Sequence, residues 1–454
     1  MTPTPTAAST STASAEAFGK APAGVYWLAA TETWERLSYY GMRALLVLYM
    51  VDASRGGLGM NSATALRLYA VYTGGVYLTT LAGGALADRW LGERRAIVLG
   101  GSLMMLGHLA LALSGMVPFF CGLLLLMLGS GLFKPNISSL VGALYAPGDA
   151  RREAGFTIFY MGINLGAFFG PMLCGTLGER VNWHLGFGIA ALGMAIGLAV
   201  FLSAGPALAG LGRTPRRAGE VAVRQPLTRA EWQRVMVLVV LTAFAMPFWA
   251  AFEQAGGLVN LYTEQRVDRT LLGFVVPATW FQAVNPILIW TMGPLFAWVW
   301  LRLVRRPGGG PTTAAKVAFG LLGMAAGMLF LVWAAQVTAQ AGVQAPLSLI
   351  LGYYVLSTAG ELCLSPVALS AVTRVAPPQV TSRMMGVWFI SLAGGNFLAG
   401  LVGSLAPHVG EFVLFSGLCA AVVVAGVGLL ALSPLLVRWT HGTDALQAGD
   451  DRQP

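Results

Sequence analysis

Apolar runs of roughly 20 residues recur along the whole chain and determine its predicted architecture. An α-helix needs about 20 residues to cross roughly 30 Å of hydrocarbon. Twelve runs reach this length, and we predict membrane-spanning helices near residues 25–50, 65–87, 95–115, 118–141, 154–178, 183–204, 234–262, 272–301, 315–338, 346–373, 384–405 and 411–437. The pattern therefore predicts an all-α membrane protein that crosses the bilayer many times.

The longest polar connection, residues 205–233, divides these runs into six and six. Rich in Pro and Arg, it is predicted to be a cytoplasmic linker between two six-helix bundles, residues 23–204 and 234–438. Residues 1–22 lack the charged start and short apolar core of a signal peptide, so we expect a disordered N-terminal tail. Residues 439–454 are expected to form a cytoplasmic tail. Two such bundles are typical of transporters whose binding site lies between the halves.

Composition and charge agree with a membrane location. The chain is 56% hydrophobic and only 10% charged, with a mean hydropathy of +0.69, which soluble domains do not reach. Its formal net charge of +9 would fit a nucleic-acid binder, but most of the Lys and Arg residues fall in the loops after even-numbered spans. Because cytoplasmic loops retain basic residues, we predict that both termini are cytoplasmic and that the protein lies in the plasma membrane, the inner membrane of a bacterium.

Several other chemistries find no support in the sequence. No GxxxxGK[ST] motif is present, so an ion gradient rather than ATP is the expected energy source. The four cysteines lie in apolar runs without the spacing of metal ligands, which favours packing over metal binding. His108 is the one histidine within a span, and we expect it to pack or to form a local hydrogen bond. We expect no enzyme activity, no cofactor and no metal.

The first predicted helix carries an unusual charged face. Six charged or aromatic residues there lie at offsets 0, 3, 4, 7, 8 and 11 from the first, so they share one side of the helix. They are Glu32, Glu35, Arg36, Tyr39, Tyr40 and Arg43. Each charge at the centre of a span costs about 2.5 to 3.5 kcal/mol on insertion scales. This face should therefore line a watery cavity or contain ion pairs. A simple structural pair of Glu32 with Arg36 would leave the other two charges unexplained.

Three further charges lie within predicted spans, namely Lys134, Glu253 and Glu361. Together with those of the first helix they make four carboxylates against three cations. Burial disfavours the charged form of a carboxylate that lacks a partner, so the extra carboxylate tends to hold a proton. Proton coupling follows from this charge balance as a hypothesis.

These residues stand in segments that resemble the signatures of the proton-dependent oligopeptide transporter family, within the major facilitator superfamily. ETWERLSYYGMRALL resembles the ExxER motif of the family's first helix. Six further segments resemble the later signatures of the family, in the same order: GLFKPNISSLVGALY, GFTIFYMGINLGAFFGP, FWAAFEQAG, PATWFQAVNPI, GELCLSPVALS and MMGVWFISLAGGN. The resemblance implies the major facilitator fold, with 12 transmembrane helices in two six-helix bundles.

GGALADRWLGERR is similar to a loop of the wider superfamily. The resemblance implies that its polar residues bridge helix ends on the cytoplasmic side and take part in gating; the residues concerned are Gly84, Asp88, Arg89, Arg94 and Arg95. Two extra helices that many bacterial relatives carry between the halves are not expected, because residues 205–233 are too few and too charged. Arg67 and Glu264 are the candidate partners for an outer gate.

The resemblance also implies roles for the buried charges. Arg43 and Lys134 would attract the carboxylate of a peptide and Glu361 would hold its amino group. Glu32, Glu35 and Arg36 would serve proton coupling, and Glu253 and Glu361 would pair across the halves with Arg43 and Lys134. Further pocket positions are implied at Tyr39, Tyr40, Tyr77, Asn164, Trp249, Asn285 and Trp388.

The function implied is proton-coupled symport of di- and tripeptides into the cell by alternating access, with the bilayer, protons and peptides as partners and the monomer as the active unit. A dipeptide is a zwitterion, so a cavity with one positive and one negative wall can recognise both termini and ignore the side chains. A transporter of nitrate or another small anion is an alternative, although it would have little use for Glu361. A drug–proton antiporter of the same superfamily is another.

Overall fold

The computed structural model describes residues 21–146, 149, 151–208, 210–213, 226–306, 310–341 and 343–443. Nearly all of the predicted N-terminal tail, the centre of the linker and most of the C-terminal tail lie outside these residues. The described chain is almost entirely helical, with two pairs of two-residue strands.

A helix is found at every predicted range. The first half contains α2 (Ala23–Val51), α3 (Ser62–Leu86), η1 (Ala87–Leu91), α4 (Glu93–Leu111), α5 (Met116–Ala143), α6 (Arg151–Arg180) and α7 (Trp183–Ser203). The second half contains α8 (Arg229–Phe252), η2 (Glu253–Gly256), α9 (Leu258–Arg266), η3 (Ala278–Ala283), α10 (Val284–Val304), α11 (Thr313–Ala341), α12 (Leu347–Val375), α13 (Thr381–Gly403), α14 (Ala406–Val409) and α15 (Glu411–Trp439).

Nine helical segments in the described residues are long and apolar enough to cross a membrane. They are the segments from α5 onward, with α8–α9, η3–α10 and α13–α14 each taken as one. The helices α2, α3 and α4 occupy the first three predicted ranges but fall outside that criterion. In α2 the four charged side chains of the polar face account for this. A membrane protein of many spans is confirmed, while the count of twelve stays a prediction.

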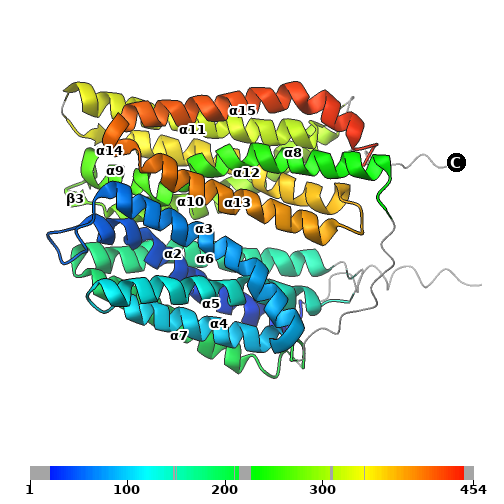
Figure 1. Ribbon diagram of the computed structural model, residues 1–454, viewed down its shortest axis with the longest axis horizontal. Helices are drawn as coiled ribbons and strands as arrows, with labels where there is room; N and C mark the ends of the chain where they lie inside the picture. Colours follow the sequence, from blue (N-terminus) through cyan, green and yellow to red (C-terminus); the bar gives the residue numbers. More distant parts are fainter. Residues whose placement is uncertain are drawn as a thin grey trace, which may run out of the picture.

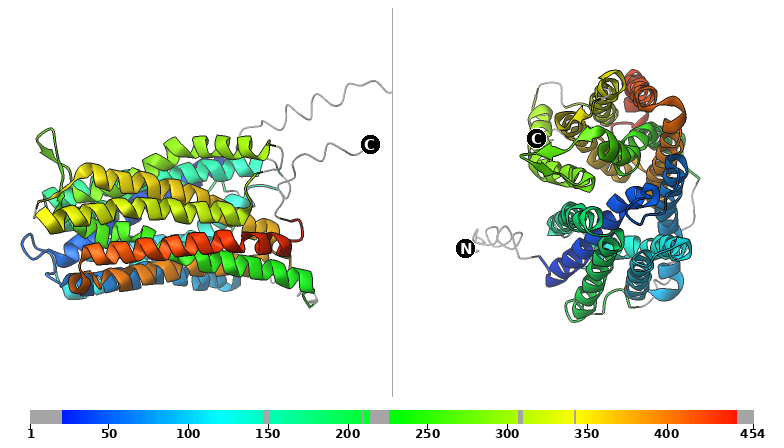
Figure 2. Two further views of the ribbon diagram at one scale, coloured as in Figure 1. Left: turned by 90° about the horizontal axis from the view of Figure 1, so that it is seen from above. Right: turned by 90° about the vertical axis from the view of Figure 1, so that its left-hand side faces the viewer.

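The long helices run side by side in two groups (Figure 1). Helices α2 to α7 form one group and α8 to α15 the other, and the view along the helices separates the two groups clearly (Figure 2). We call the end where α2 ends and α3 begins the outer end, because it is predicted to face away from the cytoplasm. The two-bundle prediction is confirmed.

The two bundles meet closely where α3 packs against α13. A methyl group at Gly400 of α13 would lie 2.1 Å from Cβ of Ala70 in α3, so only glycine allows the two backbones this approach. Small residues at such crossings let membrane helices pack tightly without a hydrophobic driving force between them. On the other side of the interface α6 lies against η3 and α10.

The structure corrects two predicted boundaries. Residues 272–277 were expected to begin a span, but β2 (Thr270–Leu271) and β3 (Phe274–Val275) form an antiparallel hairpin there. Leu272 and Gly273 both have positive φ, as a tight turn requires, and the helical segment begins only after Pro277. At the other boundary, α8 begins at Arg229 within the predicted linker, because Thr228 and Glu231 form a reciprocal capping box. The pair β1 (Val267–Asp268) and β4 (Ala345–Pro346) is parallel.

Candidate functional site

A cavity lies between the two bundles and is lined by residues of both. It measures about 1020 Å³, counting the space at its open mouth. Most of the predicted pocket residues line it: Tyr40, Arg43, Tyr77, Asn164, Trp249, Glu253, Asn285 and Glu361. Much of the cavity wall in both halves is therefore made of residues predicted from the sequence.

Other polar lining residues were not predicted: Tyr160, Gln282, Tyr353, Tyr354 and Ser357. Helical spacing carried a signal for some of them. Tyr160 precedes Asn164 by one turn, and Tyr353 and Ser357 precede Glu361 by two turns and one turn, so each lies on the same helix face as a predicted residue. These residues could have been predicted from this spacing, because each of these spans presents one face to the cavity.

An ion pair joins the two bundles at the cavity wall. Arg43 of α2 pairs through Nη2 with Oε2 of Glu253, and its Nε donates a hydrogen bond of 2.6 Å to the Tyr69 hydroxyl. Glu253 begins η2, where the helix from α8 to α9 is interrupted. A side chain at Gly256 in this interruption would lie 2.0 Å from the Tyr69 hydroxyl oxygen, so glycine leaves the space that the cluster needs. The expected pairing of Arg43 with Glu253 across the halves is present.

Glu361 is held within the second bundle. Asn285 Nδ2 donates hydrogen bonds to Glu361 Oε2 at 2.8 Å and to Thr358 Oγ1 at 3.0 Å. The expected pair of Glu361 with Lys134 is replaced by other contacts in this structure. Nζ of Lys134 lies 3.9 Å from the centroid of the Tyr39 ring and 5.6 Å from that of Tyr77. Lys134 comes from α5 of the first bundle, and the Tyr39 ring beside it belongs to that same bundle.

A second charge cluster lies within α2 itself. Arg36 Nε is 2.8 Å from Oε1 of Glu32 and 2.5 Å from Oε2 of Glu35. Exposure of the three residues is 3% for Glu32, 0% for Glu35 and 7% for Arg36. One guanidinium therefore serves two carboxylates, and the simple pair of Glu32 with Arg36 is only part of the arrangement. Lys134 is close enough to interact electrostatically with both carboxylates.

Three residues of the predicted substrate site lie outside the cavity lining, namely Lys134, Tyr39 and Trp388. Tyr39 is 2% exposed and supports Lys134, and Trp388 of α13 is 4% exposed. His108 is fully buried, and neither ring nitrogen has a hydrogen-bond partner among the described residues. The local hydrogen bond considered for His108 is thus absent, which leaves packing.

The predicted gating loop lies at the inner end, where η1 connects α3 to α4. Asp88 and Arg89 fall within η1, and the Arg89 guanidinium stacks 5.3 Å from the centroid of the Trp90 ring. The helix ends here are connected by other groups: Ser139 donates to Glu93 Oε1 at 2.5 Å, and the Arg94 main-chain N–H donates to the Gly212 carbonyl at 2.9 Å.

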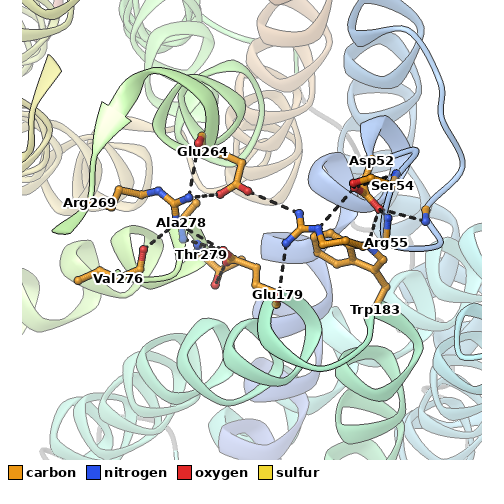
Figure 3. Close-up of polar contacts among 11 residues, drawn as sticks. Asp52, Ser54, Arg55, Glu179, Trp183, Glu264, Arg269, Val276, Ala278 and Thr279 are labelled. Carbon is orange, nitrogen blue, oxygen red and sulfur yellow. Dashed lines mark hydrogen bonds and ion pairs between the residues drawn. The ribbon is translucent and has the colours of Figure 1, made fainter. Parts of the chain in front are cut away.

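At the outer end a polar network connects the bundles (Figure 3). Glu264 of α9 accepts from Arg55 at 3.5 Å and lies 2.6 Å from Nη2 of Arg269. The expected partnership of Glu264 with Arg67 is wrong. Arg67 of α3 instead donates to Ser404 Oγ at 3.2 Å, because it faces α13, whereas the loop after α2 brings Arg55 to α9.

Glu179 at the end of α6 extends this network. It accepts hydrogen bonds from the main-chain N–H groups of Ala278 and Thr279, both at 2.9 Å, and from the Thr279 hydroxyl at 2.6 Å. Arg269 Nη1 lies 3.7 Å from the same carboxylate. Because Glu179 belongs to the first bundle and its partners to the second, these contacts hold the outer end of the interface closed.

Asp52 fixes the loop that carries Arg55. It accepts from Trp183 Nε1 at 2.9 Å and from the main-chain N–H groups of Arg55 at 2.9 Å and Gly57 at 3.2 Å. Burial opposes the charge, but the hydrogen bonds outweigh it and lower the pKa of Asp52 to about 2. The Arg55 guanidinium lies 4.6 Å from the centroid of the Trp183 ring, which orients it further.

Two helical bundles around a cavity with buried charges of both signs define a secondary transporter. The chain belongs to the POT family, whose model matches residues 94–208 and 218–411. It is 35% identical to the peptide transporter YePEPT of Yersinia enterocolitica subsp. palearctica serotype O:3 (strain YE-P4), covering 94% of this chain and 97% of that protein. It is 32% identical to a di-/tripeptide transporter of Lactococcus lactis subsp. cremoris, covering 92% and 96%.

The fold agrees with solved structures of the family. A crystal structure of peptide transporter POT in complex with sulfate matches with a TM-score of 0.87 at 36% identity, over 93% of this chain and 96% of that chain. The prediction of the oligopeptide transporter family with its major facilitator fold is therefore confirmed. The protein is a multi-pass membrane transporter and not an enzyme.

Proposed function

We propose that the protein is a proton-coupled symporter that moves di- and tripeptides into the cell across the bacterial inner membrane, as a monomer and without a cofactor. The observation that carries the proposal is the single cavity that contains both the Arg43–Glu253 pair and Glu361. The family membership and the names of the two relatives support the same substrate class.

The two walls of the cavity suit the two ends of a peptide. Arg43 on the first bundle is the group for the carboxylate, with Lys134 nearby to add positive potential. Glu361 on the second bundle is the group for the amino terminus, and Asn285 orients its carboxylate. The aromatic lining residues, among them Tyr353 and Tyr354, give side chains of any kind a surface to contact, which fits a broad substrate range.

Coupling follows from competition for the arginine. When the carboxylate of a peptide binds Arg43, Glu253 loses its partner and favours the protonated form. Peptide binding and proton binding then assist each other. The cluster of Glu32, Glu35 and Arg36 offers a second proton site, because two carboxylates share one guanidinium. A proton drives transport only if its occupancy differs between the outward and inward states.

Uptake of labelled dialanine into proteoliposomes under an inward proton gradient tests the proposal. We expect accumulation that collapses when a protonophore removes the gradient. A dipeptide with an acetylated amino terminus and an amidated carboxyl terminus should compete poorly, because neither wall can bind it. Full competition by the blocked peptide would favour a drug transporter, and nitrate uptake without dialanine uptake would favour an anion transporter.

The orientation with both termini in the cytoplasm is part of the proposal. It rests on the basic residues that gather in loops on one side. A reporter that is active only in the cytoplasm should work when it is fused after Arg438 or inserted in the linker at residues 214–225. Periplasmic activity at either site would overturn the orientation.

A further inference from the structure

A second pocket lies at the inner end of the first bundle, apart from the transport cavity. It measures about 880 Å³, counting the space at its open mouth, and is lined by Arg94, Arg95, Val98, Leu99, Ser102 and Arg213. Three arginines thus line one pocket at the first turns of α4, beside apolar side chains. Arg94 and Arg95 belong to the predicted gating loop, but neither lines the transport cavity.

The fold holds these arginines in place. The turn after α7 returns to the start of α4, where the Arg94 N–H donates to the Gly212 carbonyl at 2.9 Å. A methyl group at Gly205 would lie 3.5 Å from Nη2 of Arg94, so the guanidinium lies beside this turn. Arg213 follows Gly212 directly, and its position at the pocket is therefore set by a main-chain hydrogen bond.

The electrostatics of the pocket call for an anion. The N-terminus of α4 carries partial positive charge, and anions are stabilising there while cations are not. Arg94 and Arg95 are nevertheless in the first turn of the helix. Nη1 of Arg94 is buried and has no hydrogen-bond partner among the described residues, which is a costly state for a guanidinium donor. Glu93, the acidic residue nearby, accepts a hydrogen bond from Ser139 of α5.

The pocket continues into an apolar stripe on the same helix. Arg95, Leu99 and Ser102 share one face of α4, which continues through Leu106 and Leu109. Leu99, Leu106 and Leu109 are 43%, 49% and 46% exposed. Helices α4 and α7 lie together at the edge of the first bundle (Figure 1), so this face is available to the acyl chains of the bilayer. A free phosphate would engage the arginines and leave the leucines uncovered.

We propose that this pocket binds an anionic phospholipid of the inner leaflet. Arg94 and Arg213 hold the phosphate, and Ser102 lies within the same pocket. An acyl chain runs along Leu99 and Leu106. Basic pockets between membrane helices on the cytoplasmic side suit anionic headgroups for the same physical reason. The inference concerns a structural lipid and does not depend on which substrate the cavity transports.

Native mass spectrometry of the purified full chain in detergent tests the site with dioctanoyl phosphatidylglycerol as the probe. We expect one tightly bound lipid on the wild-type protein. Arg213→Gln should weaken it by about fivefold, and the double variant Arg94→Gln/Arg213→Gln by about 25-fold, since each arginine near the headgroup contributes about 1 kcal/mol, which is a factor of about five. Arg305→Gln, which removes a basic residue at the inner end of α10, is the matched control.

Two further measurements distinguish the lipid from other ligands. Leu99→Gln keeps all three arginines, so it should weaken binding of the lipid but leave binding of inorganic phosphate unchanged. Phosphate binding is measured by the shift in thermal unfolding temperature. Dioctanoyl phosphatidylcholine should not occupy the site. Equal binding of phosphatidylglycerol to the double variant and to the Arg305→Gln control would overturn the proposal. Stabilisation by inorganic phosphate that matches that of the lipid would overturn it too, because the site would then be one for a free anion.

Discussion

Two charge clusters on the same helix differ in how they are built. Glu32, Glu35 and Arg36 lie within one turn or so of α2, and their ion pairs are made inside one bundle. Arg43, about two turns further along, pairs with Glu253 of the other bundle. Any movement that separates the bundles at the cavity must break the second pair and can leave the first intact.

This difference separates two tasks that a coupled transporter has to perform. A pair between bundles responds to their relative position and to a substrate that competes for one partner. A cluster within one helix can keep its geometry when the bundles move, so its proton affinity then changes only through its surroundings. We therefore propose that the Arg43–Glu253 pair senses the substrate and the conformation, while the cluster within α2 stores a proton.

The largest expected effect comes from breaking the pair between the bundles. Glu253→Ala leaves the buried Arg43 without its partner, which costs about 3 to 5 kcal/mol when a buried pair loses one member. We expect a sharply lower yield, a lower thermal unfolding temperature and no peptide uptake.

The double variant Arg43→Leu/Glu253→Leu removes both charges and controls for this loss. It should regain most of the stability that Glu253→Ala loses. It should not regain transport, because the group for the peptide carboxylate is gone. Near-normal uptake by the double variant would contradict a role for the pair in substrate binding.

The next effect concerns the cluster within α2. Glu35→Gln and Glu32→Gln mimic a permanently protonated carboxylate and keep the size of the side chain. We expect each to abolish accumulation driven by a pH gradient, while exchange of peptide for peptide across proteoliposomes survives at least in part, because exchange needs no proton release. If these carboxylates only hold the helix in place, both modes should fall together with the yield of folded protein.

A smaller and more selective effect is expected at the wall for the amino terminus. Glu361→Gln keeps the hydrogen bond with Asn285 but removes the negative charge. A hydrogen bond to a charged group contributes about 1.5 to 3 kcal/mol, so the Kd for dialanine should rise roughly tenfold or more, whereas the Kd for a peptide without a free amino group should change little. Lys134→Ala should instead weaken the binding of peptides that have a free carboxylate. An equal loss for both ligands in Glu361→Gln would contradict the assignment.

Much of the cavity could be predicted because charges are rare in membrane helices. Arg43, Glu253 and Glu361 stand out in apolar sequence, and their burial in hydrocarbon would be too costly without a partner or a cavity. The residues that were missed are those whose chemistry is ordinary in a span. Tyr160, Tyr353 and Tyr354 resemble packing aromatics in sequence, and only their helical spacing from Asn164 and Glu361 indicates that they face the cavity.

Pairing between distant segments could not be read from the sequence. Arg55 and Glu264 meet only because the loop after α2 reaches across the interface, and nothing in the local pattern distinguishes Arg55 from Arg67 as the partner. The break at η2 could have been predicted, because Gly256 and Gly257 lie shortly after Glu253 and two consecutive glycines disfavour a continuous helix. The hairpin before η3 was hidden by its apolar composition, which suggests a span.

The smallest predicted effect concerns the outer network, which lies at the end of the interface opposite the predicted gating loop. Its ion pairs are partly exposed, and exposed pairs contribute about 0.2 to 1 kcal/mol each. Arg55→Gln removes one such pair between the bundles, that with Glu264, and should shift the population toward the outward-open state by no more than about fivefold. A cysteine placed at Ala167, which lines the cavity, would measure the shift through its labelling by a membrane-impermeant thiol reagent, in a protein whose exposed Cys121 is replaced by serine. Arg266→Gln, a neighbouring basic residue at the end of α9, is the control and should leave labelling unchanged.

The pH dependence of this network follows from Asp52. Its pKa in the folded protein is about 2, below the ordinary value of 3.8. A carboxylate with a lowered pKa contributes stability that is present above the ordinary value and is lost as the pH falls through the folded value. The loop carrying Arg55 should therefore stay ordered down to about pH 4, with cysteine labelling rising only below it. In Asp52→Asn the labelling should be raised already at pH 7 and lose this acid dependence. A labelling profile that rises near pH 6 and is the same in both proteins would show that another group controls the outer closure.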